Sequence, residues 1–503
     1  MIPIATPGEM RSMDQRTIRE RGVPGLTLME RAAEAVARQA ASMLPPGGRM
    51  LVLCGGGDNG GDGLAAARLL HRRGYAVSVA LLTDPTALRG DAAVNFHRLP
   101  VPVRRGFDPT AWSDPRPDLV VDALLGTGLD RDVTGEIAAA IGWINGSGLP
   151  VLSVDIPSGI DGTTGAVRGR AVRASATVTF GCPKRGCLLY PGREYAGTLT
   201  TDDIGISPDI LDQASCRAWE AANVAARLPA RPSNTHKGHY GHVAVVAGSE
   251  GMMGAGALAS LAALRAGAGL STWLYPRDAA ANPAWEVMTR PIAGRDGAFS
   301  EQSADAALRA LEGKTVLAMG PGLGRAEGTA ALVRRLAIET AMPLVLDADG
   351  IIAMAGHDEA LRSRGRLCLT PHPGELSRFT GAPVAQIVDD MIGHAQRAAE
   401  RTGAVVLLKG ASSVIAAPDG RLVINTTGNA GLATGGSGDV LTGIIAGLAA
   451  QGAELFEAAV MGAWLHGKAG DIAAAKRGMR ALIASDLIDS LPAALMSLRE
   501  ESQ

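Results

Sequence analysis

Hydrophobic and polar residues alternate between two patterns along this chain. Short apolar runs predict buried strands, and the Ala-rich stretches between them have the spacing of amphipathic helices. Their alternation predicts an α/β fold, in which parallel sheets carry helices on both faces. The expected strands begin at Met50, Val77, Asp118, Pro150 and Ala176 in the first half, and at His242, Thr272, Thr315, Pro343, Leu367 and Ala404 in the second.

The strand–helix pattern is interrupted between residues 219 and 241, where prolines and a Ser-Asn-Thr run favour a linker. A chain of 503 residues is long enough for two domains, and we place their boundary near Ala226. The expected domains are residues 1–226 and 227–503. Ahead of the first strand, the amphipathic segment from Arg11 to Met43 predicts one or two packing helices rather than a site.

Composition and charge exclude several classes of protein. The chain is 47% hydrophobic and 19% charged, which is typical of a globular protein. A net charge of −2 does not provide the basic surface that nucleic acid requires. The first residues do not resemble a signal peptide, and no apolar run reaches the roughly 18 residues of a membrane span. We therefore expect a cytoplasmic protein with reduced cysteines.

Glycine is the unusual feature of the composition, with 65 residues beside only 6 Trp, 5 Tyr and 6 Phe. The run from Gly55 to Gly63, GGGDNGGDG, lies between a predicted strand and a predicted helix. Bare backbone amides there can approach a phosphate, while Asn59 and Asp62 offer oxygen atoms to a cation or a ribose. The run lacks the spacing of a dinucleotide fingerprint or a Walker loop.

Acidic residues end two further strands of the first half. Asp122 is followed by the run from Gly126 to Asp132, and Asp155 is followed by Ile-Pro-Ser-Gly. Each aspartate alone could be a turn residue. Ligands of open parallel sheets bind at the carboxyl ends of the strands, so together these acids predict a ligand site.

The strongest signal in the second half is the run from Gly428 to Asp439. Gly435, Gly436 and Gly438 place bare amides at the start of the helix that we expect Asp439 to begin. Amides and helix dipole together predict an anion hole for a transferring phosphoryl group. Asp439 could then take a proton from a substrate hydroxyl; the alternative is a helix-capping aspartate.

Two other segments of the second half carry polar groups at strand ends. The run from Lys409 to Ser413, KGASS, offers a cation and hydroxyls to a nucleotide phosphate. His372 lies between two prolines, where a ligand role and a structural role are equally plausible. The histidines between His236 and His242 have no usual metal-ligand spacing, and we interpret them as linker and first-strand residues.

These motifs resemble those of two enzyme families. The first domain, with MDQRTIRERGVPGLTLMERAA, GGGDNGGDG, VDALLGTGL, DIPSG and TFGCPKRG, is similar to NAD(P)H-hydrate epimerases, which are Rossmann-like. The second, with GPGLG, TPHPGE, KGASSVI and GNAGLATGGSGDVLTGIIAGL, resembles ADP/ATP-dependent NAD(P)H-hydrate dehydratases of the ribokinase-like superfamily. Their fusion resembles bifunctional nicotinamide nucleotide repair enzymes. Ser413 stands where many relatives have Thr, a change that keeps the hydroxyl, and residues 290–310 match no family motif.

The resemblance implies repair of hydrated NADH and NADPH. The first domain would interconvert the R and S hydrates, and the second would dehydrate the S form with hydrolysis of ADP or ATP, accompanied by Mg²⁺. We favour ADP and expect a homo-oligomer. Phosphorylation makes the ring hydroxyl a good leaving group, which explains a kinase-like site.

The resemblance also assigns residues in both domains. In the second domain Asp439 would be the base, the hydrate would contact Ala257, Gly322, His372 and Asp439, and the nucleotide would contact Lys409, Gly410, Ala411, Ser412, Ser413 and Gly438. In the first domain Asp155 would be the acid–base group, with Asp132 as its competitor. Potassium would be held by Asn59, Asp122 and Ser158, and the hydrate by Asp58, Asn59, Gly60, Gly61, Asp62, Gly126, Thr127, Gly128, Leu129, Asp130, Arg131, Asp132 and Asp155.

Three other interpretations compete with this one. The chain could be a ribokinase-like small-molecule kinase with a noncatalytic nucleotide-binding module at its N-terminus, because such kinases share the anion hole. The first domain could be a scaffold that binds nucleotide or a partner protein without catalysis. A dehydrogenase is disfavoured, because GGGDNGGDG has the wrong spacing.

Overall fold

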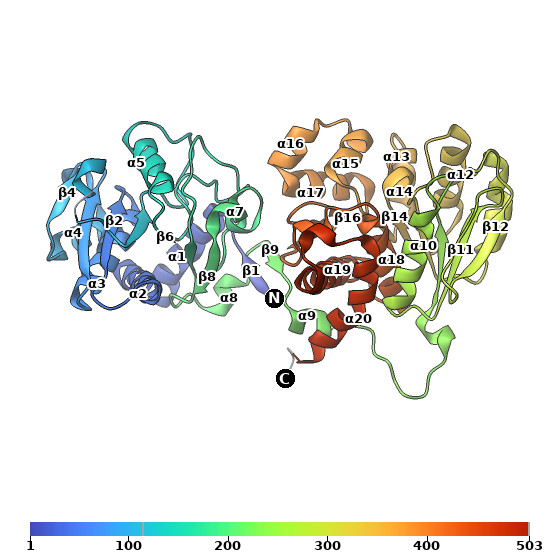
Figure 1. Ribbon diagram of the computed structural model, residues 1–503, viewed down its shortest axis with the longest axis horizontal. Coiled ribbons are helices and arrows are strands. Elements are labelled where there is room, and N and C mark those ends of the chain that lie inside the picture. The colour runs from blue at the N-terminus through green and yellow to red at the C-terminus, as the bar shows by residue number, and fades with distance from the viewer. Residues whose placement is uncertain (113–114, 501–503) are drawn as a thin grey trace. The chain divides into compact units, whose positions relative to one another are not determined.

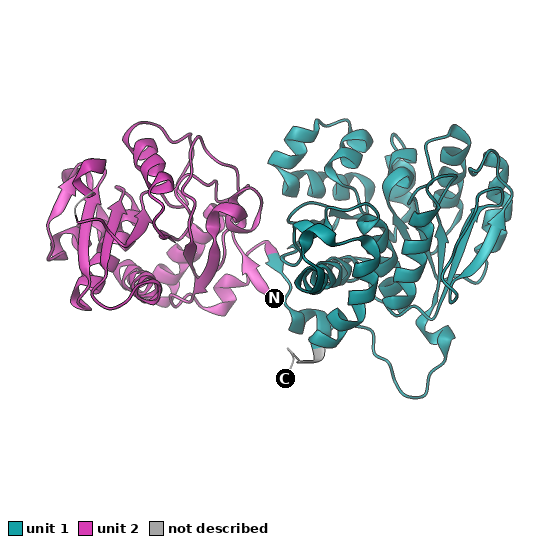
Figure 2. Ribbon diagram, in the orientation of Figure 1, with its two compact units in different colours: residues 1, 217–503 teal, residues 2–216 magenta. Residues whose placement is uncertain are grey.

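The division of the chain into two units falls after Cys216. The computed structural model describes residues 1–112 and 115–500; one unit contains residues 2–216 and the other contains residue 1 and the chain from Arg217 onward (Figure 2). This division precedes Ala226 because α9 (Ala221–Ala225) packs with α20 (Ala484–Glu500), and Val224 is buried in the core of the second unit. We refer to the N-terminal and C-terminal units.

The sheet of the N-terminal unit is parallel throughout, as the alternating pattern predicts. Its strands lie in the order β4-β3-β2-β5-β6-β7-β8. Their bounds are β2 Arg49–Cys54, β3 Ala76–Leu81, β4 Val103–Arg105, β5 Leu119–Ala123, β6 Val151–Val154, β7 Ala176–Phe180 and β8 Thr198–Asp202; the short β1 is Ile2–Ile4.

Strand β2 shows why the apolar runs do not alternate with polar residues. Met50, Val52 and Cys54 belong to one hydrophobic cluster and Leu51 and Leu53 to another, so both faces of the strand are buried. Helices α2 and α3 contribute to the first cluster and α5 to the second (Figure 1). The helices are α1 Pro7–Arg21, α2 Gly25–Met43, α3 Asp58–Arg72, α4 Gly90–Arg98, α5 Gly135–Gly146, α6 Arg185–Leu188, α7 Gly192–Ala196 and α8 Pro208–Leu211.

The amphipathic segment from Arg11 to Met43 forms two helices, as the sequence allowed. Thr6 and Glu9 make a capping box at the start of α1, with Glu9 N donating to Thr6 Oγ1 at 3.2 Å. Gly22 ends α1 in the left-handed conformation (φ +67°), and Pro24 precedes α2. This turn lets both helices approach the same end of the sheet.

The C-terminal unit has a mixed sheet with the strand order β9-β18-β17-β16-β15-β14-β13-β10-β11-β12. Strand β17 is antiparallel to both of its neighbours, and the other neighbouring strands in this order pair in parallel. The bounds are β9 Cys216–Ala218, β10 His242–Val246, β11 Leu270–Pro276, β12 Met288–Ile292, β13 Val316–Met319, β14 Leu344–Leu346, β15 Leu367–Leu369, β16 Val405–Leu408, β17 Val414–Ala416 and β18 Leu422–Ile424.

Helices α10 and α18 pack closely in this unit (Figure 1). A Cβ atom at Gly443 would lie 2.2 Å from the carbonyl oxygen of Ala259, so glycine permits the contact. The remaining helices are α10 Met253–Arg265, α11 Ala304–Ala310, α12 Glu327–Glu339, α13 Ala348–Ala353, α14 Asp358–Arg364, α15 Pro373–Thr380, α16 Val384–Asp389, α17 Met391–Thr402, α18 Ser437–Ala450 and α19 Leu455–Arg477.

Two details of the local structure differ from the sequence prediction. The GGGDNGGDG run is a loop only as far as Gly57, because α3 already begins at Asp58. Helix α18 begins at Ser437, so Asp439 lies within its first turn. Residues 290–310, which matched no motif, contain the end of β12 and the whole of α11.

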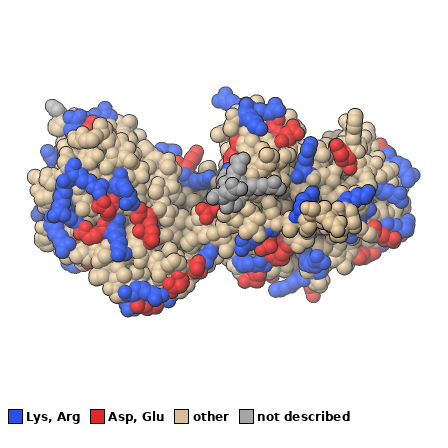
Figure 3. Space-filling model, turned by 90° about the horizontal axis from the view of Figure 1, so that it is seen from below, with Lys and Arg blue, Asp and Glu red and all other residues tan. Residues whose placement is uncertain are grey.

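Surface charge and helix hydropathy add two observations. Basic and acidic side chains are interspersed on the face that Figure 3 shows. Within residues 1–112 and 115–500, no helix has both the length and the apolarity to cross a membrane.

Candidate active sites

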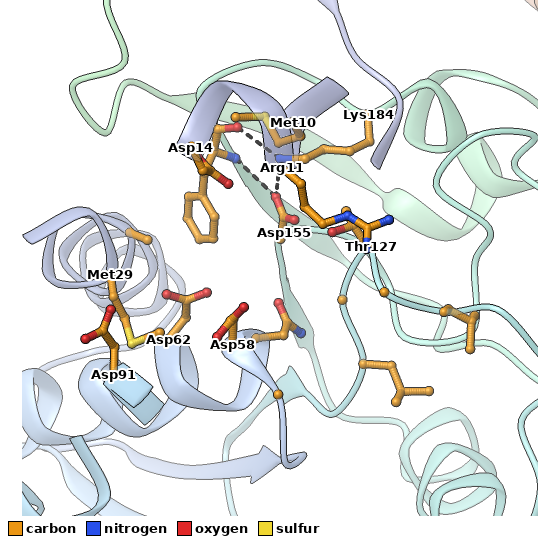
Figure 4. Close-up of a pocket in the computed structure, with 18 of the residues that line it drawn as sticks. Met10, Arg11, Asp14, Met29, Asp58, Asp62, Asp91, Thr127, Asp155 and Lys184 are labelled. Atoms are coloured by element: carbon orange, nitrogen blue, oxygen red, sulfur yellow. Dashed lines mark hydrogen bonds and ion pairs between the residues drawn. The ribbon is translucent and has the colours of Figure 1, made fainter. Parts of the chain in front are cut away.

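A cavity of about 580 Å³ opens at the carboxyl ends of the strands of the N-terminal unit. Polar side chains from α1, α3, α4 and the segments after β5, β6 and β7 line it (Figure 4). The charged and amide-bearing lining residues are Arg11, Asp14, Asp58, Asn59, Asp62, Asp91, Asp130, Arg131, Asp155 and Lys184.

Asp155 and Lys184 form a buried ion pair in this cavity. Lys184 Nζ contacts Asp155 Oδ1, and it also donates to Thr179 Oγ1 at 3.1 Å and to the carbonyl oxygen of Phe180 at 2.9 Å. Only 1% of the Lys184 side chain is exposed. Burial alone would lower the pKa of Lys184, but the Asp155 carboxylate raises it above its ordinary value, so the lysine is charged.

Asp155 has an unusual backbone conformation for an aspartate, with φ at +64°. Its amide donates to the carbonyl oxygen of Val178 at 2.7 Å. Its carboxylate accepts hydrogen bonds from Thr179 Oγ1 at 3.1 Å and the Phe180 amide at 3.3 Å. These contacts hold the side chain at the end of β6, where the sequence predicts a ligand site.

Two carboxyl groups of the cavity are protonated more readily than usual. Burial raises the pKa of Asp14 to about 6, although the ammonium of Lys184 opposes the shift. Burial also raises the pKa of Asp62 well above its usual range, and the carboxylates of Asp155, Asp58 and Asp14 add to this effect. Such groups can donate and accept protons near neutral pH.

Asp122 and Ser158 are hydrogen-bonded to each other, and Asn59 lies beside Gly126 in the loop after β5. Ser158 donates twice to the Asp122 carboxylate, through its hydroxyl at 2.5 Å and its amide at 2.9 Å. Both polar atoms of the Asn59 side chain are buried, and neither has a hydrogen-bond partner within the described part of the chain. An unsatisfied buried amide of this kind is consistent with a ligand that is held by oxygen atoms.

The structure brings together most of the residues that sequence reasoning assigned to the first site. Three of the residues assigned to the hydrate do not line the cavity: Gly60 packs against Gly55, Gly61 packs against Met29, and Asp132 is exposed beyond the cavity-lining segment. The assigned potassium ligands Asp122 and Ser158 do not line it either. Helix α1, interpreted from the sequence as packing only, contributes Asp14 to the cavity. The lining residues from the sequence assignment are Asp58, Asn59, Asp62, Gly126, Thr127, Gly128, Leu129, Asp130, Arg131 and Asp155.

In the C-terminal unit, Lys409 is the centre of a charged cluster. Its Nζ atom lies 2.7 Å from Asp347 Oδ1 and 3.7 Å from Glu375 Oε2. Thr442 on α18 donates to the other oxygen of Asp347 at 2.8 Å. Burial lowers the pKa of Lys409, but these carboxylates raise it by more, so the ammonium is charged.

Asp439 approaches this cluster from the first turn of α18. A Cβ atom at the preceding Gly438 would lie 3.3 Å from Lys409 Nζ. Burial raises the pKa of Asp439 to about 6, with Asp347 adding to the shift and Lys409 opposing it. The ring of His466 supports the same turn. Its Nε2 atom lies 3.1 Å from Ser437 Oγ and 3.0 Å from the carbonyl oxygen of Ser437. Burial lowers the pKa of His466 to about 4, so it is neutral support for the turn.

His372 and Glu375 make a reciprocal cap at the start of α15. The His372 Nδ1 atom accepts from the Gly374 amide at 3.0 Å, and Glu375 Oε2 accepts from the His372 amide at 2.8 Å. The other Glu375 oxygen lies 3.2 Å from His372 Nε2. Glu375 therefore connects His372 to Lys409.

Helix α10 brings the other predicted residues of this site towards α18. Leu258, next to Ala257, would be 2.6 Å from a Cβ atom at Gly436. Gly322 has a φ of +61°, and a Cβ atom built there would lie 3.0 Å from Ala255 Cβ. The loop that contains Gly322 therefore packs on the start of α10. In the KGASS loop, Ser413 Oγ lies 3.4 Å from the amide of Gly410, and Ser412 is buried.

Four cluster residues were absent from the sequence assignment: Asp14, Lys184, Asp347 and Glu375. Three of them had a local signal. Asp347 follows a predicted strand as Asp155 does, and Glu375 ends the TPHPGE motif. Lys184 is the only lysine in residues 1–216. Asp14 had no signal beyond its motif, because α1 is separated in sequence from the loops that it faces.

Comparison with known proteins agrees with this two-site arrangement. The family model described as NAD(P)H-hydrate dehydratase matches residues 243–493, and the model described as YjeF-related protein N-terminus matches residues 25–186. A ribokinase-like superfamily protein from Enterococcus faecalis, 24% identical, superposes with a TM-score of 0.50 over 56% of this chain and 96% of its own. The fold of the C-terminal unit is therefore ribokinase-like, as the motifs predicted.

Full-length relatives define the family. A bifunctional NAD(P)H-hydrate repair enzyme of Moorella thermoacetica is 42% identical over 99% of this chain and 97% of its own length. The corresponding enzyme of Thermofilum pendens is 40% identical over the same shares of the two chains. The chain belongs to the family of bifunctional NAD(P)H-hydrate repair enzymes. Because these relatives match both units of the chain, the alternative of a small-molecule kinase with a noncatalytic N-terminal module is not favoured.

Proposed function

We propose that the N-terminal unit interconverts the R and S hydrates of NADH and NADPH, and that the C-terminal unit dehydrates the S hydrate with ADP or ATP and Mg²⁺. Full-length similarity to bifunctional repair enzymes supports the pairing of activities. The observation that carries the proposal is the acid–cation cluster at the start of α18, where Asp439 faces Lys409.

The chemistry of the second site follows from this cluster. Asp439 takes the proton of the ring hydroxyl, whose oxygen then attacks the terminal phosphoryl group of the nucleotide. Amides at Gly436 and Gly438 and the α18 dipole stabilise the transferring group, and Lys409 neutralises phosphate charge. The ring C–O bond then breaks with loss of the neighbouring C–H proton. The products are NAD(P)H, inorganic phosphate and the shortened nucleotide.

Lys409 can bind a nucleotide phosphate only if its ion pairs with Asp347 and Glu375 orient the ammonium without blocking it. Asp347 binds it at 2.7 Å and is itself fixed by Thr442. Glu375 lies further away, and burial raises the pKa of its carboxyl. We assign Asp347 to positioning Lys409, which would neutralise the charge of a nucleotide phosphate accompanied by Mg²⁺. The other nucleotide contacts would come from Gly410, Ala411, Ser412, Ser413 and Gly438. The hydrate would contact Ala257, Gly322 and His372.

A direct test uses the full chain and a chemically prepared mixture of R and S NADH hydrates. With ADP or ATP and Mg²⁺, the absorbance of dihydronicotinamide should return for the whole mixture, because the first unit supplies S hydrate continuously. A recovery that stops when the S form is consumed would contradict epimerisation. A stable phosphorylated product without recovery would support a kinase instead.

Potassium is the cation that we assign to the first site, held by Asn59, Asp122 and Ser158. The donor set is suitable, because carbonyl, carboxylate and hydroxyl oxygens are ligands for hard cations. Asn59 Oδ1 is buried without a partner, as a ligand-binding oxygen would be. A bound cation would satisfy Asn59 Oδ1 and place positive charge at the start of α3.

We expect epimerisation to depend on K⁺ through Asn59. Replacing Asn59→Leu should raise the K⁺ concentration for half-maximal epimerisation at least about tenfold, since it removes one oxygen ligand. Epimerisation rates in KCl and in choline chloride measure this effect. Dehydration of pure S hydrate by the same variant is the control and should keep its wild-type rate. Equal K⁺ dependence in the variant and the wild type would reject the assignment.

Location and assembly complete the proposal. We assign the enzyme to the cytoplasm, where NADH and NADPH turn over, and to a homo-oligomer. Size-exclusion chromatography with light scattering tests the assembly, and a mass equal to one chain would contradict it.

A further inference from the structure

The carboxyl groups of the first cavity are arranged on two opposite sides. Asp14 enters from α1, whereas Asp58 and Asp62 enter from α3 across the open space (Figure 4). Asp155 lies between them at the end of β6 and is paired with Lys184. Arg11 extends from the same helix as Asp14 and also lines the cavity. The cavity therefore presents acidic groups to two faces of any planar ligand that it holds.

Among residues 1–112 and 115–500, only one of these carboxyl groups, that of Asp155, has a cationic partner within ion-pair distance. Lys184 contacts Asp155, and its three hydrogen bonds to Asp155, Thr179 and Phe180 leave it fixed. Asp14 faces this pair and Asp58, and its burial favours the protonated form. Several carboxyl groups around one ammonium therefore share protons rather than all ionising together. Asp155 is held in place by Lys184, Thr179 and Phe180, while Asp14 remains available to exchange a proton.

An independent observation shows that the cavity is built for a ligand. Asn59 lines the same space, is 8% exposed, and has both side-chain polar atoms buried without a protein partner. Native proteins rarely leave a buried amide unpaired unless something else satisfies it. The acidic residues thus surround a binding space and are not merely a surface cluster.

Epimerisation at a hydroxyl-bearing ring carbon requires proton transfer on two faces. The C–O bond breaks on one face as the electron pair of the ring nitrogen forms a C=N bond, and the leaving oxygen needs a proton to depart as water. Water then adds to the opposite face of the planar iminium and must lose a proton. One acid and one base on opposite faces complete the cycle without any other reactant.

On the basis of the proposed epimerase function, we propose that Asp14 and Asp62 are the two acid–base catalytic residues, one on each face of the hydrated nicotinamide ring. In one direction Asp62 donates its proton to the departing hydroxyl and Asp14 accepts a proton from the incoming water. The pair is then set for the reverse direction, and water in the cavity redistributes the proton. Asp155 and Lys184 act as positioning residues, with the Asp155 carboxylate stabilising the cationic iminium.

The test follows interconversion of R and S NADH hydrate by the full chain, without nucleotide so that dehydration is silent, in H₂¹⁸O. The wild type should incorporate ¹⁸O at the ring hydroxyl as it epimerises. Asp14→Asn and Asp62→Asn should each slow epimerisation and ¹⁸O uptake together by about 100-fold or more. Hydrate affinity should change by less than about threefold, since Asn preserves the shape of the side chain. Glu20→Gln is the matched control on α1: its side chain pairs with Arg16, it does not line the cavity, and both rates should stay unchanged.

The outcomes separate this inference from the function on which it rests. A wild type that does not interconvert the hydrates contradicts the proposed function itself. Interconversion without ¹⁸O uptake overturns the dehydration route, and an Asp14→Asn variant within about threefold of wild type overturns the catalytic assignment while the function stands. If a variant fails to bind hydrate, the wild-type pH profile decides. The rate should rise with pH through about 6, where Asp14 loses its proton while Asp62 keeps its own, so that the pair holds one acid and one base; a flat profile would reject the inference.

Discussion

Replacing Asp439→Asn is expected to reduce dehydration of S NADH hydrate by about 1000-fold, because the hydroxyl loses its base. The substitution keeps the size of the side chain and removes its negative charge beside Lys409. Recovery of dihydronicotinamide absorbance with ADP measures dehydration, and interconversion of the hydrates without nucleotide measures epimerisation. The second activity should be retained.

The wild-type dehydration rate should also report the protonation of Asp439. Since a base must be ionised, and burial raises the pKa of this carboxyl to about 6, the rate should rise with pH through 6 and level off above it. Asp419→Asn is a suitable control, because Asp419 is half exposed and paired with Arg421 away from the cluster. Full dehydration by Asp439→Asn would refute the assigned role.

Replacing Lys184→Met is expected to have the largest effect on stability, because it leaves the Asp155 carboxylate without its cation. Removal of one partner from a buried ion pair costs about 3–5 kcal/mol of the free energy of unfolding. Epimerisation should be lost as well, since Asp155 is no longer held in place. Calorimetric unfolding of the full chain measures the stability of the N-terminal unit, which contains the substitution.

Two further variants separate the ion pair from general packing. Lys184→Met combined with Asp155→Asn should recover much of the lost stability, because the unpaired charge is gone. Arg72→Met removes an exposed cation from α3 and should change the free energy of unfolding by less than about 0.5 kcal/mol. If the double variant were as unstable as the single one, the cost would come from lost packing around the Lys184 side chain.

The sequence predicted the architecture well because it depends on local patterns. Runs such as that of β2 are apolar on both faces, and this property alone favours a covered parallel sheet. The glycine loops and strand-end acids were predicted for the same reason, since each lies directly after a strand. The glycines before Asp439 predicted a helix start, and Asp439 lies in the first turn of α18.

Side chains that act across long sequence separations could not be assigned in this way. Asp14 reaches the first cavity only because the turn at Gly22 folds α1 and α2 over the sheet. Lys184 stands 29 residues beyond the partner with which it pairs. In the second site, Asp347 and Lys409 are separated by 62 residues. Their pairing is a product of strand order, which periodicity does not encode.

The backbone construction of both sites has a consequence for genetics. A Cβ atom at Gly55 would lie 1.9 Å from the carbonyl oxygen of Leu124, and one at Gly320 would lie 1.8 Å from that of Asp347. Every missense change of these codons adds a side chain where none can be accommodated, whereas many changes of neighbouring surface codons are harmless. Inactivating alleles recovered from a random screen should therefore be concentrated at glycine codons. We therefore expect this gene to tolerate mutation least at the glycine codons of its two sites.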